Sequence, residues 1–171
     1  MRRYTLALLA VATSAAAATP YEQRCAHIVA TQGRVAETRR LHELFDASWA
    51  YALDEFPELA TAVGAPGGAR RWTDRSLAAI ARRKREAEAP ARVLASIDRR
   101  RLPDPDRLSY DLFRRDVEEA LAARRFPREL LPVTQLGGVQ QDAARVLAQM
   151  PATTVAQLED VAARLRALPA A

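Results

Sequence analysis

Helical periodicity interrupted by proline and glycine constrains this fold more than any other feature of the sequence. From residue 34 onward, apolar residues recur every three to four positions, and no run alternates with a period of two for long enough to form a convincing strand. Proline and glycine separate the periodic segments, and both residue types interrupt helices. The sequence therefore predicts an all-α fold of about five amphipathic helices joined by Pro- and Gly-rich connections.

Prolines and polar caps bound the first two predicted helices. The first spans about residues 34–56 and ends where Pro57 removes a backbone donor. The second follows Asp74 or Ser76, either of which is a favourable N-cap. Pro90 lies inside this second helix, so we expect a kink or a split there.

Three more predicted helices occupy the second half of the chain. The third follows the turn RLPDPDR and runs to about Arg125, and a short fourth helix ends at Pro151. The fifth opens with TVAQ, a capping-box pattern that begins at Thr154. The apolar positions predicted to face the core are Leu41, Leu44, Phe45, Trp49, Ala52 and Leu53 in the first helix, Leu77, Ile80, Ala81, Leu94 and Ile97 in the second, Leu108, Leu112, Phe113, Val117, Ala120 and Leu121 in the third, Ala143, Val146, Leu147 and Met150 in the fourth, and Leu158, Val161, Leu165 and Leu168 in the fifth.

The first eighteen residues have the order of a cleaved secretory signal. A positive start, MRRY, precedes a short apolar run and the small-residue site AAA at 16–18. The apolar run is shorter than the about 20 residues that a membrane span needs, so we expect no stable anchor after cleavage. We expect residues 1–18 to be removed, 19–33 to be a flexible mature N-terminus and 34–171 to be one helical domain. The predicted location is periplasmic or extracellular.

Charge and aromatic content argue against a nucleic-acid partner. The net charge is +5, and aromatic residues make up 6% of the chain, whereas nucleic-acid surfaces combine a basic patch with stacking aromatics. The basic run RRKR at 82–85 is followed at once by Glu86 and Glu88, which is typical of a solvated helix face that carries both signs. Cys25 is the only cysteine, so no intrachain disulfide can form.

RLHELFD, residues 40–46, is the stretch that comes nearest to a catalytic motif. A zinc metallopeptidase helix places a second His four residues after the first, with a Glu between them as general base. Here His42 and Glu43 are followed by Asp46 at that position, and His27 is the only other histidine. A metal site would need a third ligand, so the pattern favours a boundary histidine beside a solvent glutamate.

Two other stretches invite a functional interpretation. Ser109-Tyr110-Asp111 has no histidine near it in sequence to complete a catalytic triad. QLGGVQQD, residues 135–142, could present backbone N–H groups to an anion, but it lacks the preceding strand and the Lys-Ser/Thr of a P-loop. A glycine turn that leads into a helix is the favoured interpretation. The residues themselves therefore predict no catalytic, cofactor-binding or metal-binding side chain.

Several segments, in their order and spacing, resemble one protein family. They are RLHELFDASWAYALDEFPELATAVG, RWTDRS, LSYDLFRRDVEEAL, RFPRELLPVTQLGGVQQDAARVLAQMP and VAARLRALP. Together they resemble the N-terminal portion of the bacterial family catalogued as domain of unknown function 885, from about Arg40 to Leu168. LPVTQLGGVQQD is the most specific piece, because helical periodicity does not produce such a string. The loop GAPGGARRW, residues 64–72, and Pro90 depart from the family's pattern.

The resemblance implies an exported, largely helical protein, several hundred residues long in its full-length relatives and similar in fold to zinc-dependent carboxypeptidases. It also implies that the family's His/Glu metal-binding motif lies far downstream of these segments. No residue of this chain therefore inherits a catalytic role, and zinc and a peptide substrate are implied only for full-length relatives.

Three functional hypotheses follow. The first is an N-terminal helical segment of an exported metallopeptidase-like protein, a fragment of a larger helical fold without catalytic activity of its own. The alternative is a standalone periplasmic helical binding or interaction module. The third is a metal-dependent hydrolase that uses His42, Glu43 and Asp46. Because nothing after Ala171 covers the apolar stripe of the fifth helix, we also expect self-association through that helix.

Overall fold

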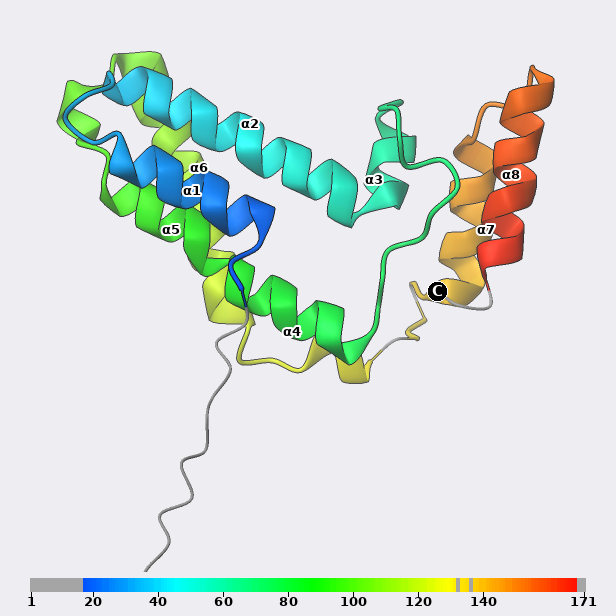
Figure 1. Ribbon diagram of the computed structural model, residues 1–171. Helices are drawn as coiled ribbons and strands as arrows, with labels where there is room; N and C mark the ends of the chain where they lie inside the picture. The colour runs from blue at the N-terminus through cyan, green and yellow to red at the C-terminus, as the bar shows by residue number, and fades with distance from the viewer. Residues whose placement is uncertain (1–16, 132, 136, 169–171) are drawn as a thin grey trace, which may run out of the picture.

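The computed structural model of the protein describes residues 17–131, 133–135 and 137–168. Within them the chain forms helices and no β-strand, apart from a lone β-bridge between Val133 and Gly138. The elements, drawn in Figure 1, are α1 (Pro20–Ala30), α2 (Glu37–Glu55), α3 (Pro57–Ala62), α4 (Leu77–Glu86), α5 (Glu88–Ala95), η1 (Arg99–Arg101), α6 (Asp104–Ala123), η2 (Arg128–Leu130), α7 (Val139–Gln149) and α8 (Val155–Ala167), where η marks a 3-10 turn. The all-α prediction is confirmed.

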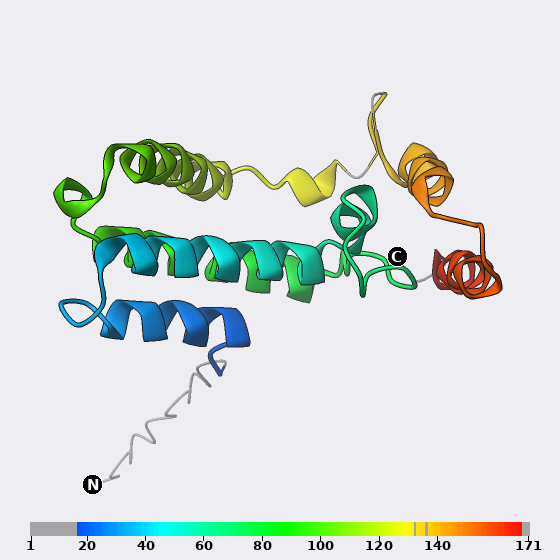
Figure 2. The same ribbon diagram turned by 90° about the horizontal axis from the view of Figure 1, so that it is seen from above.

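Four helices share the main hydrophobic core. Figure 2 shows α1 and α6 on opposite sides of the layer that contains α2 and α5. Burying one Val, Leu or Ile side chain contributes roughly 1.5 to 3 kcal/mol, so this cluster is the main source of stability. Its buried residues are Cys25, Ile28, Leu41, Leu44, Ala89, Val93, Leu94, Ile97, Leu102, Tyr110 and Val117.

Helix α1 corrects the expectation of a flexible segment over residues 19–33. Thr19 caps it through a capping box, in which Thr19 Oγ1 accepts from the Glu22 N–H and the Thr19 N–H donates to Glu22 Oε2. Cys25 and Ile28 enter the core with 1% and 2% of their surface exposed. Two buried residues on a mostly polar helix give only a weak apolar period, which is why the pattern was not apparent. The predicted signal peptide lies outside the described residues, except for residues 17 and 18.

Proline breaks the chain where the sequence predicts. Pro57 ends the first predicted helix, and α3 begins with it as a separate short helix. The second predicted helix splits into α4 and α5 at Ala87. Pro90 has no N–H to donate to the Glu86 carbonyl four residues earlier, so the helix cannot run through unbroken. The remaining three predictions correspond to α6, α7 and α8.

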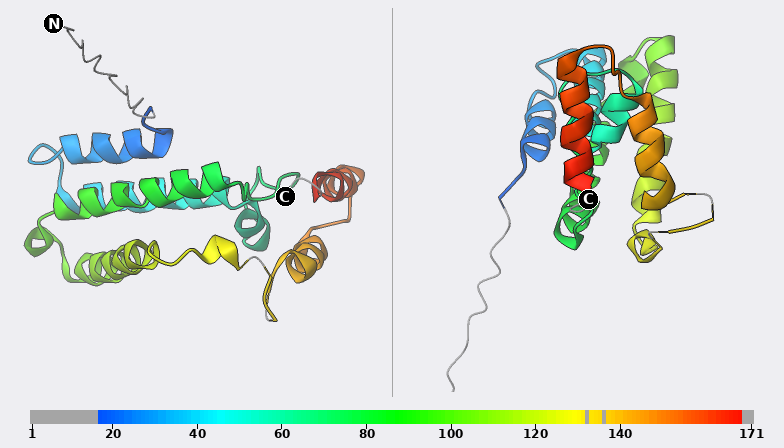
Figure 3. Two further views of the ribbon diagram at one scale, coloured as in Figure 1. Left: turned by 90° about the horizontal axis from the view of Figure 1, so that it is seen from below. Right: turned by 90° about the vertical axis from the view of Figure 1, so that its right-hand side faces the viewer.

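Helices α3, α7 and α8 form a second group beside the four-helix core (Figure 3). α3 packs against α7, and the loop 64–72 folds back onto α3. This return requires a glycine at position 68, because a Cβ there would lie 3.0 Å from Ala60 Cβ and 3.1 Å from the Pro57 carbonyl oxygen. The close approach gives the unusual loop GAPGGARRW a packing role.

A buried arginine attaches α8 to the loop and to α3. Arg164 is fully buried; its Nε donates to the Arg71 carbonyl at 3.0 Å and its Nη1 to Thr61 Oγ1 at 2.6 Å. Its guanidinium lies 5.0 Å from the Trp72 ring, and Trp72 Nε1 donates to the Arg164 carbonyl. Burial without a directly bonded carboxylate lowers the pKa of Arg164.

No helix within the described ranges combines the length and apolar content that crossing a membrane requires. The core side of α2 includes the polar residues Glu37 and Arg40, whose ion pair is 2.7 Å long. Arg40 also donates to the Ser96 carbonyl, so the buried charge holds α2 to the end of α5. Several positions predicted for the core are exposed instead. They are Trp49, Leu77, Ala81, Leu108, Leu112, Ala120, Leu158 and Leu165.

Candidate functional site

A cavity of about 410 Å³ lies between the start of α1, the second half of α2 and the end of α4. The Tyr21 and Tyr51 rings stack in its wall, with their centroids 4.2 Å apart. Both tyrosine hydroxyls are occupied: Tyr21 shares a hydrogen bond with Ser48, and Tyr51 donates to Glu86. With both hydroxyls paired and the rings stacked on each other, the two tyrosines form an aromatic part of the wall. The lining residues are Thr19, Pro20, Tyr21, Arg24, Ala47, Ala50, Tyr51, Asp54, Glu55, Arg82 and Glu86.

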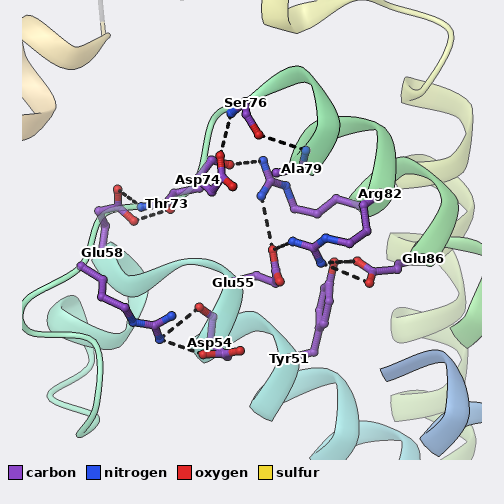
Figure 4. Close-up of polar contacts among 12 residues, drawn as sticks. Tyr51, Asp54, Glu55, Glu58, Thr73, Asp74, Ser76, Ala79, Arg82 and Glu86 are labelled. Carbon is purple, nitrogen blue, oxygen red and sulfur yellow. Dashed lines mark hydrogen bonds and ion pairs between the residues drawn. The ribbon is translucent and has the colours of Figure 1, made fainter. Parts of the chain in front are cut away.

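Charged side chains from α2 and α4 that line this cavity contact one another (Figure 4). Arg82 donates to Glu55 Oε2 at 2.7 Å and to both oxygens of Glu86, at 2.9 and 3.1 Å. The Tyr51 hydroxyl donates to Glu86 Oε2 at 2.7 Å, and Arg83 donates to Glu55 at 3.3 Å. These five residues, Tyr51, Glu55, Arg82, Arg83 and Glu86, are called the Arg82 cluster below.

Helical spacing brings the Arg82 cluster together. Tyr51 and Glu55 are four residues apart on α2, as are Arg82 and Glu86 on α4, so each pair lies on one helix face. Ser76 fixes the start of α4, because its Oγ accepts from the Ala79 N–H. Local spacing and the N-cap thus order the side chains within each helix, and the packing of α4 beside α2 brings the two pairs together, as Figure 4 shows.

Burial and ion pairing set the protonation of the cavity wall. Burial opposes ionisation of Glu55, but hydrogen bonds from Arg82 and Arg83 outweigh it and lower the pKa of this carboxyl. The hydrogen bond with Glu55 is also the main reason that the pKa of Arg82 is raised. Burial raises the pKa of Tyr21 and of Tyr51. Near neutral pH the two tyrosines are therefore uncharged and the Glu55–Arg82 pair is ionised.

The Arg82 cluster suits binding better than acid-base chemistry. Each of its carboxylates already accepts hydrogen bonds from arginine, and Glu86 keeps 1% of its side chain exposed. A general acid or base needs a proton that can be exchanged near the working pH, whereas the lowered pKa of Glu55 and the raised pKa of Arg82 keep that pair ionised. Among the described residues, the wall's other guanidinium, that of Arg24, makes no ion pair, so it is available to an anionic group of a ligand.

The residues of the His-Glu stretch lie outside this cavity and do not converge on one another. His42 Nε2 lies 3.0 Å from Asp106 Oδ1 on α6, and hydrogen bonding to His42 lowers the pKa of Asp106. Glu43 accepts from Arg39 on its own helix, and Asp46 is exposed. These side chains do not fit a zinc site. In the ranges 17–131, 133–135 and 137–168, no group of three or more His, Cys, Asp and Glu residues is arranged to hold a metal ion.

The Ser109-Tyr110-Asp111 stretch contributes to structure. Ser109 Oγ donates to the Pro105 carbonyl, the Tyr110 hydroxyl donates to the Leu94 carbonyl, and Asp111 pairs with Arg99 at 2.5 Å. Each polar atom is thus used within α6 or between α6 and its neighbours.

The QLGG loop borders a second cavity of about 360 Å³. Gly138 precedes α7 with φ of 142°, a left-handed conformation that favours glycine. The cavity is lined by the carboxylates Glu129 and Asp142 and by a single guanidinium, that of Arg75. The negative charges of these carboxylates oppose the partial positive charge at the N-terminus of α7. The cavity therefore attracts an anion only weakly.

Sequence reasoning missed the Arg82 cluster although its signal was present. The RRKR run with Glu86 was interpreted as a solvated face, but Glu86 is buried and α4 turns Arg82 toward α2. The i,i+4 spacing of Arg82 and Glu86 is visible in the sequence. The partner of Glu86 on α2, Tyr51, lies 35 residues away, and no local pattern connects the two.

Comparison with known proteins gives one result. A family profile described as "Bacterial protein of unknown function (DUF885)" matches residues 57–171. No curated protein matches the chain, and no solved structure does. The matched range includes α3 to α8 and covers more than half of the sequence. The chain therefore belongs to this family of bacterial proteins, DUF885.

Proposed function

We propose that this chain is the N-terminal helical segment of an exported, metallopeptidase-like protein, and that it acts by binding rather than by catalysis. The cavity between α1, α2 and α4 is the site we assign to that role, with a peptide as the ligand. The stacked pair of Tyr21 and Tyr51 carries the proposal, because a flat aromatic wall is suited to an aromatic or aliphatic peptide side chain.

The charges of the wall support an extended peptide over a compact anion. The Arg82 cluster is internally balanced, with two arginines against two glutamates, so it adds no net attraction for an anion. Arg24 and Asp54, which also line the cavity, provide one charge of each sign; Asp54 pairs with Arg71 at 2.7 Å, and 73% of its side chain stays exposed. A peptide backbone and its termini can use both charges, whereas a small anion can use only Arg24.

Export is supported by where the fold begins. The first helix starts at Pro20 and is capped by Thr19, so cleavage after Ala18 would leave every described helix intact. Mass spectrometry of protein collected outside the cytoplasm should find an N-terminus near Thr19. Recovery of an intact Met1 there would overturn this part of the proposal.

Binding is tested by filling the cavity. Ala50 is exposed and lines the wall, so Ala50→Trp should occupy the space without touching the Arg82 cluster. The probe is the tripeptide Ala-Phe-Ala with free termini, titrated by calorimetry, and Ala120→Trp on the exposed face of α6 is the matched control. We expect Ala50→Trp to weaken binding at least about tenfold, which is 1.4 kcal/mol, and Ala120→Trp to leave it unchanged. Equal affinities in both variants would refute the site.

A second candidate function is a standalone helical binding module, and the core favours it. The buried cluster draws on α1, α2, α5 and α6, all within residues 20–123, so much of the fold needs no further partner. Urea unfolding with a hydrophobic dye separates the two candidates. A segment of a larger fold should bind the dye and unfold at low denaturant, whereas a standalone module should remain dye-free and unfold in one sharp transition.

A further inference from the structure

The start of α1 belongs to the wall of the 410 Å³ cavity, and one carboxylate holds it to α4. Thr19, Pro20 and Tyr21 line the cavity. Glu22 Oε2 accepts from the Thr19 N–H at 2.8 Å, and Glu22 Oε1 accepts from Arg85 Nε on α4 at 3.2 Å. The hydrogen bond from Thr19 lowers the pKa of Glu22, so this carboxyl is ionised near neutral pH. A carboxylate with 15% of its side chain exposed therefore contacts the nitrogen of residue 19.

Cleavage after Ala18 changes the chemistry of that nitrogen. In the uncut chain it is the neutral amide of the peptide bond between Ala18 and Thr19. Hydrolysis by a signal peptidase leaves a carboxylate on Ala18 and an amino group on Thr19, which takes up a proton at neutral pH because α-amino groups have an ordinary pKa of about 7.7 to 8.0. The hydrogen bond to Glu22 then becomes an ion pair. Charge-assisted hydrogen bonds are roughly twice as strong as neutral ones.

The effects that oppose this ion pair are weaker than the attraction. The N-terminus of α1 carries the positive end of the helix dipole, which is equivalent to about half an elementary charge. Glu22 carries a full opposite charge 2.8 Å from the nitrogen, so attraction outweighs the dipole. Arg85, which shares Glu22, keeps 42% of its side chain exposed and is screened by solvent. Cleavage also removes the Ala18 carbonyl to which Gln23 Nε2 donates, but that hydrogen bond is exposed and water can replace it.

We propose that Glu22 receives the N-terminus that cleavage creates. The α-ammonium group of Thr19 pairs with Glu22, and Glu22 in turn pairs with Arg85. Removal of the first eighteen residues thus ties the start of α1 more firmly to α4, and the cavity wall is more rigid in the processed protein than in its precursor. The inference rests on the export part of the proposed function, because it needs cleavage after Ala18, and it adds a step of regulation to the same cavity.

The test compares two chains that differ only in where they begin, at Thr19 or at Ala17. Each is released from a fusion partner by a cut directly before its first residue, so the result does not depend on export. Both chains retain every described helix and begin with one free amine. In the chain from Ala17, however, the nitrogen of Thr19 remains an amide. Circular dichroism follows thermal unfolding of each chain at pH 7, with and without Glu22→Gln.

Glu22→Gln should lower the Tm of the chain from Thr19 by at least about 2 °C more than that of the chain from Ala17. The reason is that only the first chain loses an ion pair with the ammonium group. Glu119→Gln is the matched control, because it removes an exposed pair with Arg115 on α6 and should affect both chains equally. Equal losses from Glu22→Gln in the two chains would overturn the proposal.

Hydrogen exchange locates the effect without any substitution. Amides of α1 and α4 should exchange at least about threefold more slowly in the chain from Thr19, and those of α7 should exchange at the same rate in both chains. No difference in α1, or an equal difference in α7, would contradict the ion pair. The export test fails separately: an intact Met1 outside the cytoplasm refutes the cleavage on which the inference rests, whereas equal losses in the two chains refute the ion pair alone.

Discussion

Cys25 shows how strongly the core changes the chemistry of a single side chain. Only 1% of its surface is exposed, and burial raises the pKa of the thiol to about 11. The thiolate is the reactive form, so a higher pKa and poor access both slow reaction. Cys25, in the first helix of the described chain, is thereby an inert core residue.

We predict that Cys25 resists thiol reagents in the folded protein. At pH 8 the thiolate fraction should be on the order of 100-fold lower than for an exposed cysteine, and burial should slow the reaction further. The measurement is the rate of colour release from a disulfide reagent, with and without urea. A native rate equal to the unfolded rate would mean that α1 is not packed on the core.

At the scale of elements, two arginines attach helices that share little apolar surface. Arg82 links α4 to α2 through Glu55, and Arg164 links α8 to α3 and to the loop 64–72. Removing Arg82 leaves the buried charge of Glu86 uncompensated, and this costs more than the pair itself contributes. Removing Arg164, which has no directly bonded carboxylate, leaves the Arg71 carbonyl and the Thr61 hydroxyl without their donor. These two positions should therefore be more sensitive than the many exposed ion pairs.

Arg82→Ala should destabilise the fold, because it leaves Glu86 buried with only Tyr51 as a donor. We expect a loss of about 3 kcal/mol in the free energy of unfolding, at the low end for a broken buried pair because about a third of Arg82 is exposed. Arg115→Ala, which removes an exposed i,i+4 pair with Glu119, is the control and should have no measurable effect. Urea unfolding measures both. Equal stabilities would show that the Arg82 cluster does not hold α4.

Arg164→Ala should loosen α8 and leave the core intact. The variant loses the hydrogen bonds to Thr61 and to the Arg71 carbonyl, so amide exchange in α8 should accelerate at least about tenfold. Arg166→Ala, on the exposed side of the same helix, is the matched control. Hydrogen exchange detected by mass spectrometry measures the exchange of α8 separately from that of the four core helices. Faster exchange throughout α1, α2, α5 and α6 would contradict a local anchor.

For the whole molecule, periodic apolar residues and prolines were sufficient to predict the class and most helix positions. Pro57 and Pro90 mark real breaks, because a missing N–H acts locally whatever surrounds it. Side-chain burial was predicted less well, since it depends on which face meets a neighbour. Glu86 and Arg164 are buried through partners 35 and 93 residues away, Tyr51 and Arg71. Pairings at that separation leave no periodic signal in the sequence.

Acid should destabilise the protein below the ordinary carboxyl range. The pKa of Glu22 is lowered, chiefly by the hydrogen bond from the Thr19 backbone, and the pKa of Glu55 is lowered by its arginine partners despite burial. As pH falls below about 4.5, the unfolded chain takes up protons before the folded one, so stability declines until the folded carboxyls protonate. Urea midpoints at several pH values measure this. Glu22→Gln should flatten the dependence, and a flat wild-type profile would contradict it.

The measurement that most directly tests binding without catalysis is an NMR titration of the chain with the Ala-Phe-Ala peptide, with and without zinc. We expect amide shift changes confined to the start of α1, the second half of α2 and α4, an unchanged map when zinc is added, and an intact peptide at the end. Shift changes centred on His42 and Asp46, or cleaved peptide in the zinc sample, would contradict it.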